Sequence, residues 1–211
     1  MNPYGWRRVA RECALKALYT TELGQGTLTE ALEQVFGILD DPEHLEDLVQ
    51  EVVIGDVLRP RLEQFATELA TSVWKRRVEL DRRISVVISD FDYTRLALVD
   101  RNVLRLALLE FLDYDYIPPN VTMNEAIELA KKYSTADSGR FVNGVLANVL
   151  KDTPKANFDE KTAPKDPDQG VREKVEKSKP VEPEVEELQP DADELKWGRR
   201  FGTWKTKSDE Q

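Results

Sequence analysis

The chain has 211 residues, with 40 acidic against 30 basic side chains and a formal net charge of −10. This balance excludes a protein that binds nucleic acid unselectively over its whole surface, because phosphate contacts need locally positive potential. With no N-terminal apolar segment and no run of about 18 apolar residues, we expect neither secretion nor membrane spanning. A single cysteine, Cys13, cannot form an intramolecular disulfide, which is typical of the reducing cytoplasm.

Composition divides the chain into two parts. Residues 1–151 carry dense helical periodicity, whereas residues 152–211 hold six of the eleven prolines, long charged stretches and few large apolar side chains. Such a segment cannot bury enough apolar area to offset ~1–2 kcal/mol of backbone entropy per residue. We predict a helical domain over 1–151 and a charged, Pro-rich disordered tail over 152–211. The tail ends in a basic-aromatic segment, 195–205, for which an inert terminus and a linear binding motif both stay open.

The first half of the domain predicts several helices. A helix is expected from about Trp6 to Leu23, ended by the pair of glycines at 24 and 26. Thr27 and Glu30 have capping-box spacing and open a second helix. A long helical region then starts near Pro42, divided at Gly55 and Pro60, and continues through residues 60–79. The β-branched run within 81–88 resembles a strand, but no partner strand is near it, so we predict helix.

The second half predicts a buried core. Residues 94–114 are apolar nearly all round, which is typical of a helix at the centre of a bundle. Thr122 and Glu125 again have capping-box spacing, and Asp137 or Ser138 is a candidate N-cap for the last helix. The chain is therefore predicted to be all-α, a bundle of about seven helices with short connections.

The sequence offers little that supports catalysis. His44 is the single histidine and has no cysteine or second histidine beside it, so neither a metal site nor a histidine-based triad is indicated. The glycines at 24 and 26 fit helix termination better than a dinucleotide fingerprint. We therefore expect no enzyme and no cofactor.

Arginines gather near the start of the first helix. Arg7 and Arg11 lie on one face at 3.6 residues per turn, Arg8 lies beside them, and Tyr19 follows two turns later. Guanidinium groups suit phosphate oxygens, and a tyrosine ring offers a stacking surface for an unpaired base. From spacing alone, a solubilising arginine cluster with Tyr19 in the core is the more favoured interpretation.

Four stretches of the chain resemble the NusB family. The segment 7–19 is similar to the family's Arg-rich opening helix, 103–107 with Glu110 to its central helix, and 124–131 with 140–146 to two recognisable later helices. The resemblance implies two small three-helix subdomains that share the first helix. It also implies binding of single-stranded boxA RNA together with NusE, a small-subunit ribosomal protein, in an RNA polymerase elongation complex that promotes antitermination on ribosomal RNA operons.

The resemblance also assigns roles to residues. RNA contacts would come from the first helix and from the later motif, namely Arg7, Arg8, Arg11, Tyr19, Arg140, Phe141 and Asn143. Asp100 matches an acidic position that would contact the basic ribosomal-protein partner. Both a monomer and a homodimer occur in the family. Val9 departs from the pattern, which usually continues with arginine. Residues 64–79 extend the middle of the domain, where solubilising a longer helix is the favoured role of Lys75, Arg76 and Arg77.

The predicted function is thus a cytoplasmic, non-enzymatic transcription antitermination factor that binds RNA. The alternative is a helical protein–protein adaptor that does not bind RNA. Neutralisation of the first-helix patch by Glu12, Glu22 or a folded-back acidic tail would favour the adaptor. A methyltransferase fused to such a domain is disfavoured because no cofactor-binding α/β pattern follows Leu150.

Overall fold

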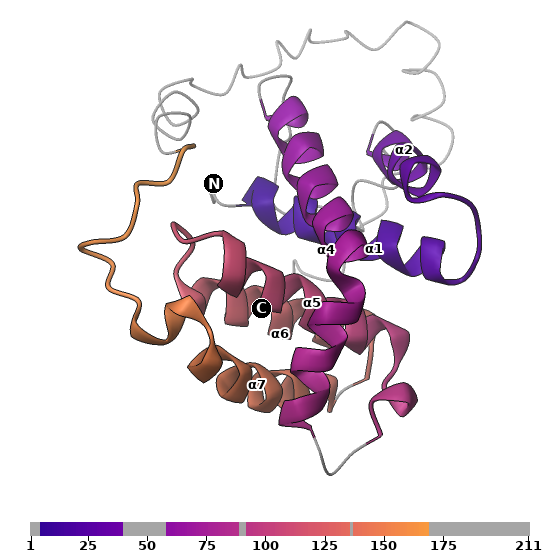
Figure 1. The fold of residues 1–211 in the computed structure, drawn as a ribbon. Helices are drawn as coiled ribbons and strands as arrows, with labels where there is room; N and C mark the ends of the chain where they lie inside the picture. The colour runs from indigo at the N-terminus through magenta and orange to yellow at the C-terminus, as the bar shows by residue number, and fades with distance from the viewer. Residues whose placement is uncertain (1–4, 40–57, 89–91, 136, 169–211) are drawn as a thin grey trace, which may run out of the picture. The chain divides into compact units, whose positions relative to one another are not determined.

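A computed structural model describes residues 5–39, 58–88, 92–135 and 137–168 (Figure 1). These residues contain no strand, which confirms the all-α prediction. The six α-helices they contain are α1 Gly5–Glu22, α2 Leu28–Ile38, α4 Arg59–Val87, α5 Leu98–Asp113, α6 Pro119–Tyr133 and α7 Ser138–Val149. The predicted helical region after Pro42 lies outside the described residues as far as residue 57.

The turn between α1 and α2 follows the local signals of the sequence. Gly24 and Gly26 both have positive φ angles, 74° and 102°, which a side chain would strain. The backbone N–H of Glu30 donates to the Thr27 hydroxyl at 3.3 Å, and the Thr27 N–H donates to the Glu30 carboxylate at 2.7 Å. The predicted capping box is confirmed because both of its bonds are made within four residues.

α4 is a single helix of 29 residues that runs to Val87. Pro60 lies in its first turn, where the missing N–H costs nothing, so this helix begins where the sequence predicts a division at Pro60. The buried positions Leu62, Leu69, Val73, Leu80 and Ile84 recur at intervals of seven and four and form one stripe. The strand-like run near its end is helical, as predicted.

α5 is the centre of the packing. It contacts α1, α4, α6 and α7, and eleven of its residues, from Asp100 to Phe111, are buried. The predicted start at residue 94 is wrong. A 3-10 turn, Tyr93–Arg95, comes first, with its N–H at Thr94 bonded to the Asp92 carboxylate, and the extended backbone at Leu96 and Ala97 separates it from α5.

The starts of α6 and α7 differ from the cap predictions. α6 begins at Pro119, so Thr122 lies inside the helix, buried, with its hydroxyl donating to Glu110 at 2.7 Å. The capping role predicted for Thr122 is therefore wrong. Asp137 is at the N-cap position of α7 as predicted, although its side chain makes no capping bond, and Ser138 is the first helical residue.

The helices form two packed groups around shared elements. α2 packs on α1 and α4, whereas α6 and α7 pack on each other and on α5. α1 and α4 each contact members of both groups, and in Figure 1 α4 passes alongside both. This matches the two small subdomains sharing the first helix that the resemblance implies. Among the described helices, none combines the length and apolarity needed to cross a membrane.

The packed structure continues beyond the predicted boundary at residue 151. Two further 3-10 turns, Leu150–Asp152 and Pro154–Asn157, follow α7, and Thr153 and Lys155 are buried. The Lys155 ammonium donates to the Ile117 carbonyl at 2.6 Å. The predicted start of the disordered tail at residue 152 is therefore too early. The sequence does not reveal this, because the acceptor of Lys155 is the distant Ile117 carbonyl. Residues 169–211, including the basic-aromatic segment, lie outside the described residues.

Candidate nucleic-acid interface

The three arginines of α1 lie within two turns but in three different environments. Arg11 is buried in the core, Arg7 is covered by the chain that follows α7, and Arg8 is at the surface. The three arginines therefore do not form the single exposed basic face that the sequence predicts.

Arg11 belongs to the core. Its guanidinium makes two hydrogen bonds to the Glu110 carboxylate of α5, at 2.6 and 3.0 Å, and the Thr122 hydroxyl donates to the same carboxylate. Arg11 is 5% exposed and Glu110 1%. Burial alone would lower the pKa of Arg11, but the paired carboxylate outweighs it and the pKa is raised. A phosphate has no access to this guanidinium, so Arg11 is a structural residue.

Arg7 is covered by two carboxylates of the segment beyond α7. Its terminal nitrogens donate to Asp166 at 2.7 and 2.5 Å and to Asp168 at 2.7 Å. Three aromatic rings surround the guanidinium, those of Trp6, Phe65 and Tyr116, at 5.0, 5.7 and 5.4 Å. The net effect of burial, which lowers the pKa of Arg7, and of these carboxylates, which raise it, is a raised pKa. The arginine therefore stays charged.

Arg8 and Tyr19 lie on the solvent side of α1. The Arg8 side chain is 52% exposed and bonds the Glu125 carboxylate of α6 at 2.8 and 2.9 Å. Tyr19 is 38% exposed, so the predicted alternative of a core tyrosine is wrong. Eleven residues make about three helical turns, which puts Arg8 and Tyr19 on the same stripe of α1.

Two lysines that the sequence analysis did not select extend this stripe. Lys16 of α1 and Lys132 of α6 both approach the buried Glu12 carboxylate, at 3.4 and 3.1 Å, and both lie over the Tyr133 ring, at 5.4 and 5.2 Å. The Tyr133 hydroxyl also donates to Glu12. Two cations around one carboxylate leave a net positive charge there. Lys16 could have been found from its position two turns after Arg8, but Lys132 needed the α1–α6 contact.

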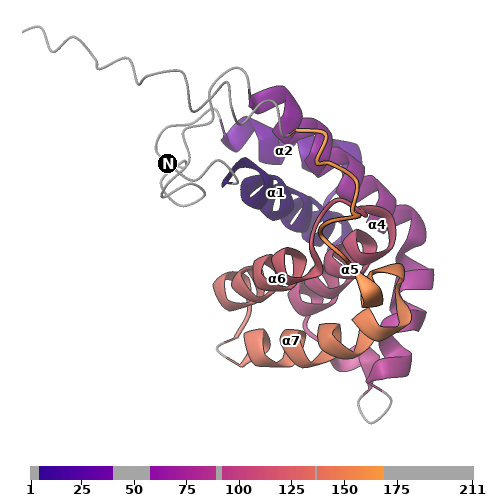
Figure 2. The same cartoon turned by 90° about the vertical axis from the view of Figure 1, so that its left-hand side faces the viewer.

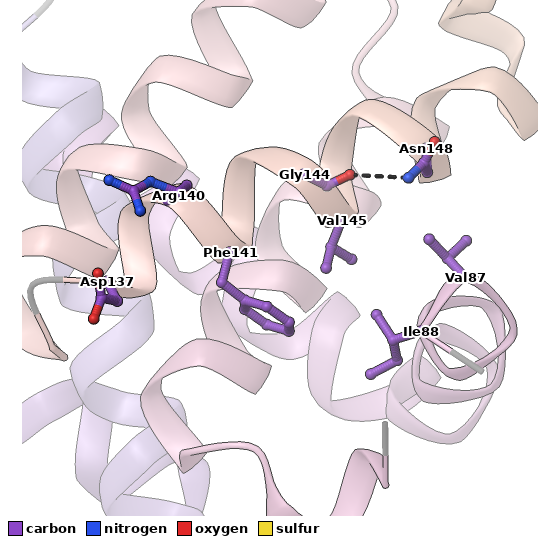
Figure 3. Close-up of a pocket in the computed structure, with 8 residues that line it drawn as sticks. All are labelled: Val87, Ile88, Asp137, Arg140, Phe141, Gly144, Val145 and Asn148. Carbon is purple, nitrogen blue, oxygen red and sulfur yellow. Dashed lines mark hydrogen bonds between the residues drawn. The ribbon is translucent and has the colours of Figure 1, made fainter. Parts of the chain in front are cut away.

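The α7 motif is divided between a groove and open surface. Arg140 and Phe141 line a groove of about 590 Å³ between α7 and the end of α4, whereas Asn143 is exposed elsewhere on α7. Figure 3 shows Phe141 and Val145 pointing toward Ile88, with Arg140 at one end of the groove. The groove therefore has an apolar floor, and a cation, Arg140, and an anion, Asp137, lie together at one end.

α6 lies between α1 and α7, so the two predicted groups are not adjacent (Figure 2). α6 and α7 approach closely at Gly139, where an added Cβ would lie 3.0 Å from Lys131 Cγ. Lys131 and Lys132 thus lie between the α1 stripe and Arg140. We call the set Arg8, Lys16, Tyr19, Lys132 and Arg140 the cationic strip.

The acidic residue proposed for partner contact is buried. Asp100, in the first turn of α5, is 7% exposed and accepts a hydrogen bond from the Ser138 hydroxyl at 3.0 Å. This bond ties the start of α7 to the start of α5. Asp100 is therefore placed to stabilise the fold, and its carboxylate offers little to an outside protein.

The basic cluster in the middle of α4 is engaged by its own neighbours. Arg76 pairs with Glu79 and with Asp113 of α5, at 3.0 and 2.6 Å, and Arg77 stacks on the Trp74 ring at 4.5 Å. This agrees with a longer, solubilised helix. Glu22, the other acid that might have neutralised α1, instead bonds Arg105 and Asn102.

Sequence comparison identifies the family. The profile of the NusB family matches residues 8–151. The chain belongs to the NusB family. The transcription antitermination protein NusB of Symbiobacterium thermophilum is 36% identical over 145 residues, covering 69% of this chain and 89% of its own. NusB of Geobacter sulfurreducens is 37% identical over 150 residues, covering 71% and 97%. As a member of this family of transcription antitermination factors, the chain is not an enzyme.

Solved structures of the NusB family share this fold. T. maritima NusB superposes with a TM-score of 0.59 at 32% identity, covering 72% of this chain and 96% of the other. A structure of the antitermination factors NusB and NusE in complex with double-stranded RNA gives a TM-score of 0.54 at 26% identity, covering 70% and 97%. The residues after 151, which cover Arg7, lie beyond the match to the family profile.

Proposed function

We propose that this protein is an antitermination factor that binds single-stranded boxA-type RNA, as in ribosomal RNA operon leaders. It would do so together with NusE, as part of a cytoplasmic RNA polymerase elongation complex. The observation that carries the proposal is the cationic strip, because it gathers three exposed cations, the partly buried Lys16 and an exposed tyrosine on a chain whose net charge is −10. The solved complex of a related NusB with NusE and double-stranded RNA supports NusE and RNA as the classes of partner, and the single-stranded boxA element is the finer part of this proposal.

Each side chain of the strip has a chemical role in this proposal. Arg8, Lys16, Lys132 and Arg140 would contact phosphate oxygens, and Tyr19 would stack on an unpaired base. Phe141 offers a second, partly buried ring in its groove, and the exposed Asn143 amide is suited to a base edge. Arg11 and Asp100 are left out because both are buried.

Binding to a boxA oligonucleotide, with and without NusE and at stated salt, tests the proposal. The expected result is tighter binding than to a scrambled RNA of equal length and composition, with a further gain when NusE is added. Equal affinity for the two RNAs in both conditions would refute RNA recognition. Sedimentation of the free protein tests the homodimer that the family resemblance allows.

The adaptor that does not bind RNA has one specific observation in its favour. Carboxylates neutralise part of the first helix, with Glu12 beside Lys16 and Lys132, and a folded-back acidic segment on Arg7. This alternative predicts that the protein binds NusE but binds neither the boxA nor the scrambled oligonucleotide. The same titrations therefore separate the two functions.

A further inference from the structure

The chain beyond α7 returns to the beginning of the domain. After the turn Pro154–Asn157, residues 158–168 pass α5 and reach the start of α4, as the orange segment in Figure 2 shows. There Asp166 and Asp168 contact Arg7 of α1, and Asp168 also contacts Arg61 of α4. Two carboxylates thus join two arginines that lie far apart in the sequence.

The two arginines form a compact cation site. The Arg7 side chain is 7% exposed, and its guanidinium lies against the rings of Trp6, Phe65 and Tyr116. Arg61 is 42% exposed and makes the outer edge of the site. A planar guanidinium backed by aromatic rings and presenting paired N–H groups fits any compact oxyanion, whether carboxylate or phosphate.

The segment that fills the site is weakly held along its length. Thr153 and Lys155 are buried and anchor its beginning, but no residue between 156 and 168 is buried. Phe158 and Ala163 are partly buried and line a pocket with Phe111 and Leu112 of α5, and the pair of aspartates holds the far end of the segment. The Arg7 pairs are largely shielded, with the Asp166 and Asp168 side chains 14% and 17% exposed, and only Arg61 is nearly half exposed. Another oxyanion can take the place of these carboxylates, because it brings the same charge to the same guanidinium groups and the aspartates lie on a segment outside the helices.

We propose that Arg7 and Arg61 form a phosphate site for single-stranded RNA, and that Asp166 and Asp168 occupy it in the free protein. The inference rests on the proposed function and adds to it an internal competitor for the RNA backbone. Because the segment is tethered at Lys155, its carboxylates are present at an effective concentration of order mM. An RNA phosphate must displace them, so the free protein binds RNA more weakly than its arginines would allow.

The test compares full-length variants of equal net charge. Asp166→Asn with Asp168→Asn empties the site of carboxylates, while Asp152→Asn with Glu160→Gln removes two exposed acids from the chain between α7 and the site. RNA affinity is measured over a range of salt with boxA and scrambled oligonucleotides. We expect the first variant to bind about three- to ten-fold more tightly than the second. Its salt slope should be steeper by about 0.7 for each additional RNA phosphate that the emptied site binds.

A second variant checks that Arg61 belongs to the site. Arg61→Ala should weaken binding more in the Asp166→Asn, Asp168→Asn background than in the wild type, where the aspartates already occupy the site. Equal affinity and slope for the two charge-matched double variants would overturn the proposal, as would a failure of the emptied variant to bind any RNA at low salt. The proposed function has its own test, which it fails if wild type binds boxA and scrambled RNA equally. The charge-matched comparison can be made with either RNA, so the two failures can be told apart.

Discussion

Arg11 and Arg7 lie one turn apart on α1, yet they belong to two different regions of the molecule. Arg11 pairs with Glu110 in the core, where both side chains are almost fully buried. Arg7 pairs with Asp166 and Asp168 at an edge that the half-exposed Arg61 completes. Two arginines at helical spacing therefore have different roles. The role of each depends on whether its carboxylate comes from a core helix or from the segment beyond α7.

The two regions differ in the exposure of their carboxylates, because the Glu110 side chain is 1% exposed and those of Asp166 and Asp168 are 14% and 17% exposed. A buried pair has given up its hydration, so losing one member leaves an uncompensated charge in the core. Arg7 is as shielded as Arg11, but its acids lie on a segment outside the helices, so another anion can replace them while the guanidinium keeps a counter-charge. The first arrangement fixes α1 against α5, and the second can be exchanged.

The largest expected effect comes from breaking the core pair. Glu110→Gln leaves the Arg11 guanidinium buried without a counter-charge and should lower the free energy of unfolding by about 3 kcal/mol. Urea denaturation measures it. Glu125→Gln, which removes the partner of the half-exposed Arg8, is the control and should cost less than about 1 kcal/mol. Similar losses for both variants would contradict the distinction between core and edge.

The next effect concerns the cationic strip. Tyr19→Ala should weaken boxA binding by about 1–3 kcal/mol, because a base loses its stacking surface, while the exposed position spares stability. Tyr19→Phe keeps the ring and should retain most of the affinity. Fluorescence titration measures both. If Phe and Ala weaken binding equally, the hydroxyl rather than the ring makes the contact.

A smaller, pH-dependent effect is expected where the covering segment is anchored. Burial lowers the pKa of Lys155 from 10.5 to about 8, although the Glu110 and Asp115 carboxylates oppose it. The unfolded chain keeps this proton up to about pH 10.5, whereas the folded chain releases it near pH 8. Stability should therefore rise across that interval, by about 1 kcal/mol after allowing for solvent screening.

Comparison of urea midpoints for wild type and Lys155→Met across this interval isolates the contribution, since tyrosine ionisation is common to both proteins. Wild type should gain about 1 kcal/mol of stability relative to Lys155→Met as pH rises from about 8 to 10.5. Lys151→Met, at an exposed position in the preceding turn, should show no such trend. A constant difference for Lys155→Met would mean that the buried lysine does not change its charge there.

The smallest effect is expected at the middle of α4. Hydrogen bonds from Arg76 to Glu79 and Asp113 raise the pKa of the arginine, but the three side chains are each about one-third exposed or more. Arg76→Ala should change the unfolding free energy by less than about 1 kcal/mol and leave RNA affinity unchanged. Thermal denaturation and the boxA titration check this. A loss as large as that of Glu110→Gln would show that exposure does not separate the two kinds of pair.

Structures that depend on neighbouring residues can be predicted from the sequence, whereas pairings between distant residues cannot. The capping box at Thr27 is predictable because both of its bonds close within four residues. The same spacing at Thr122 is misleading, because Pro119 already begins α6 and Glu110 takes the Thr122 hydroxyl. Likewise, the first helix and its arginines can be placed from the sequence, but the burial of Arg11 cannot.

The sequence by itself determined the helical class, the family and most helix boundaries, since these depend on periodicity, turn residues and a motif order that local chemistry sets. Only the tertiary structure decided which cations face solvent. Glu110 lies 99 residues from Arg11, and Asp166 lies 159 residues from Arg7. No local pattern records such pairings, because they arise only when the packing of apolar faces brings distant polar groups together and removes their water.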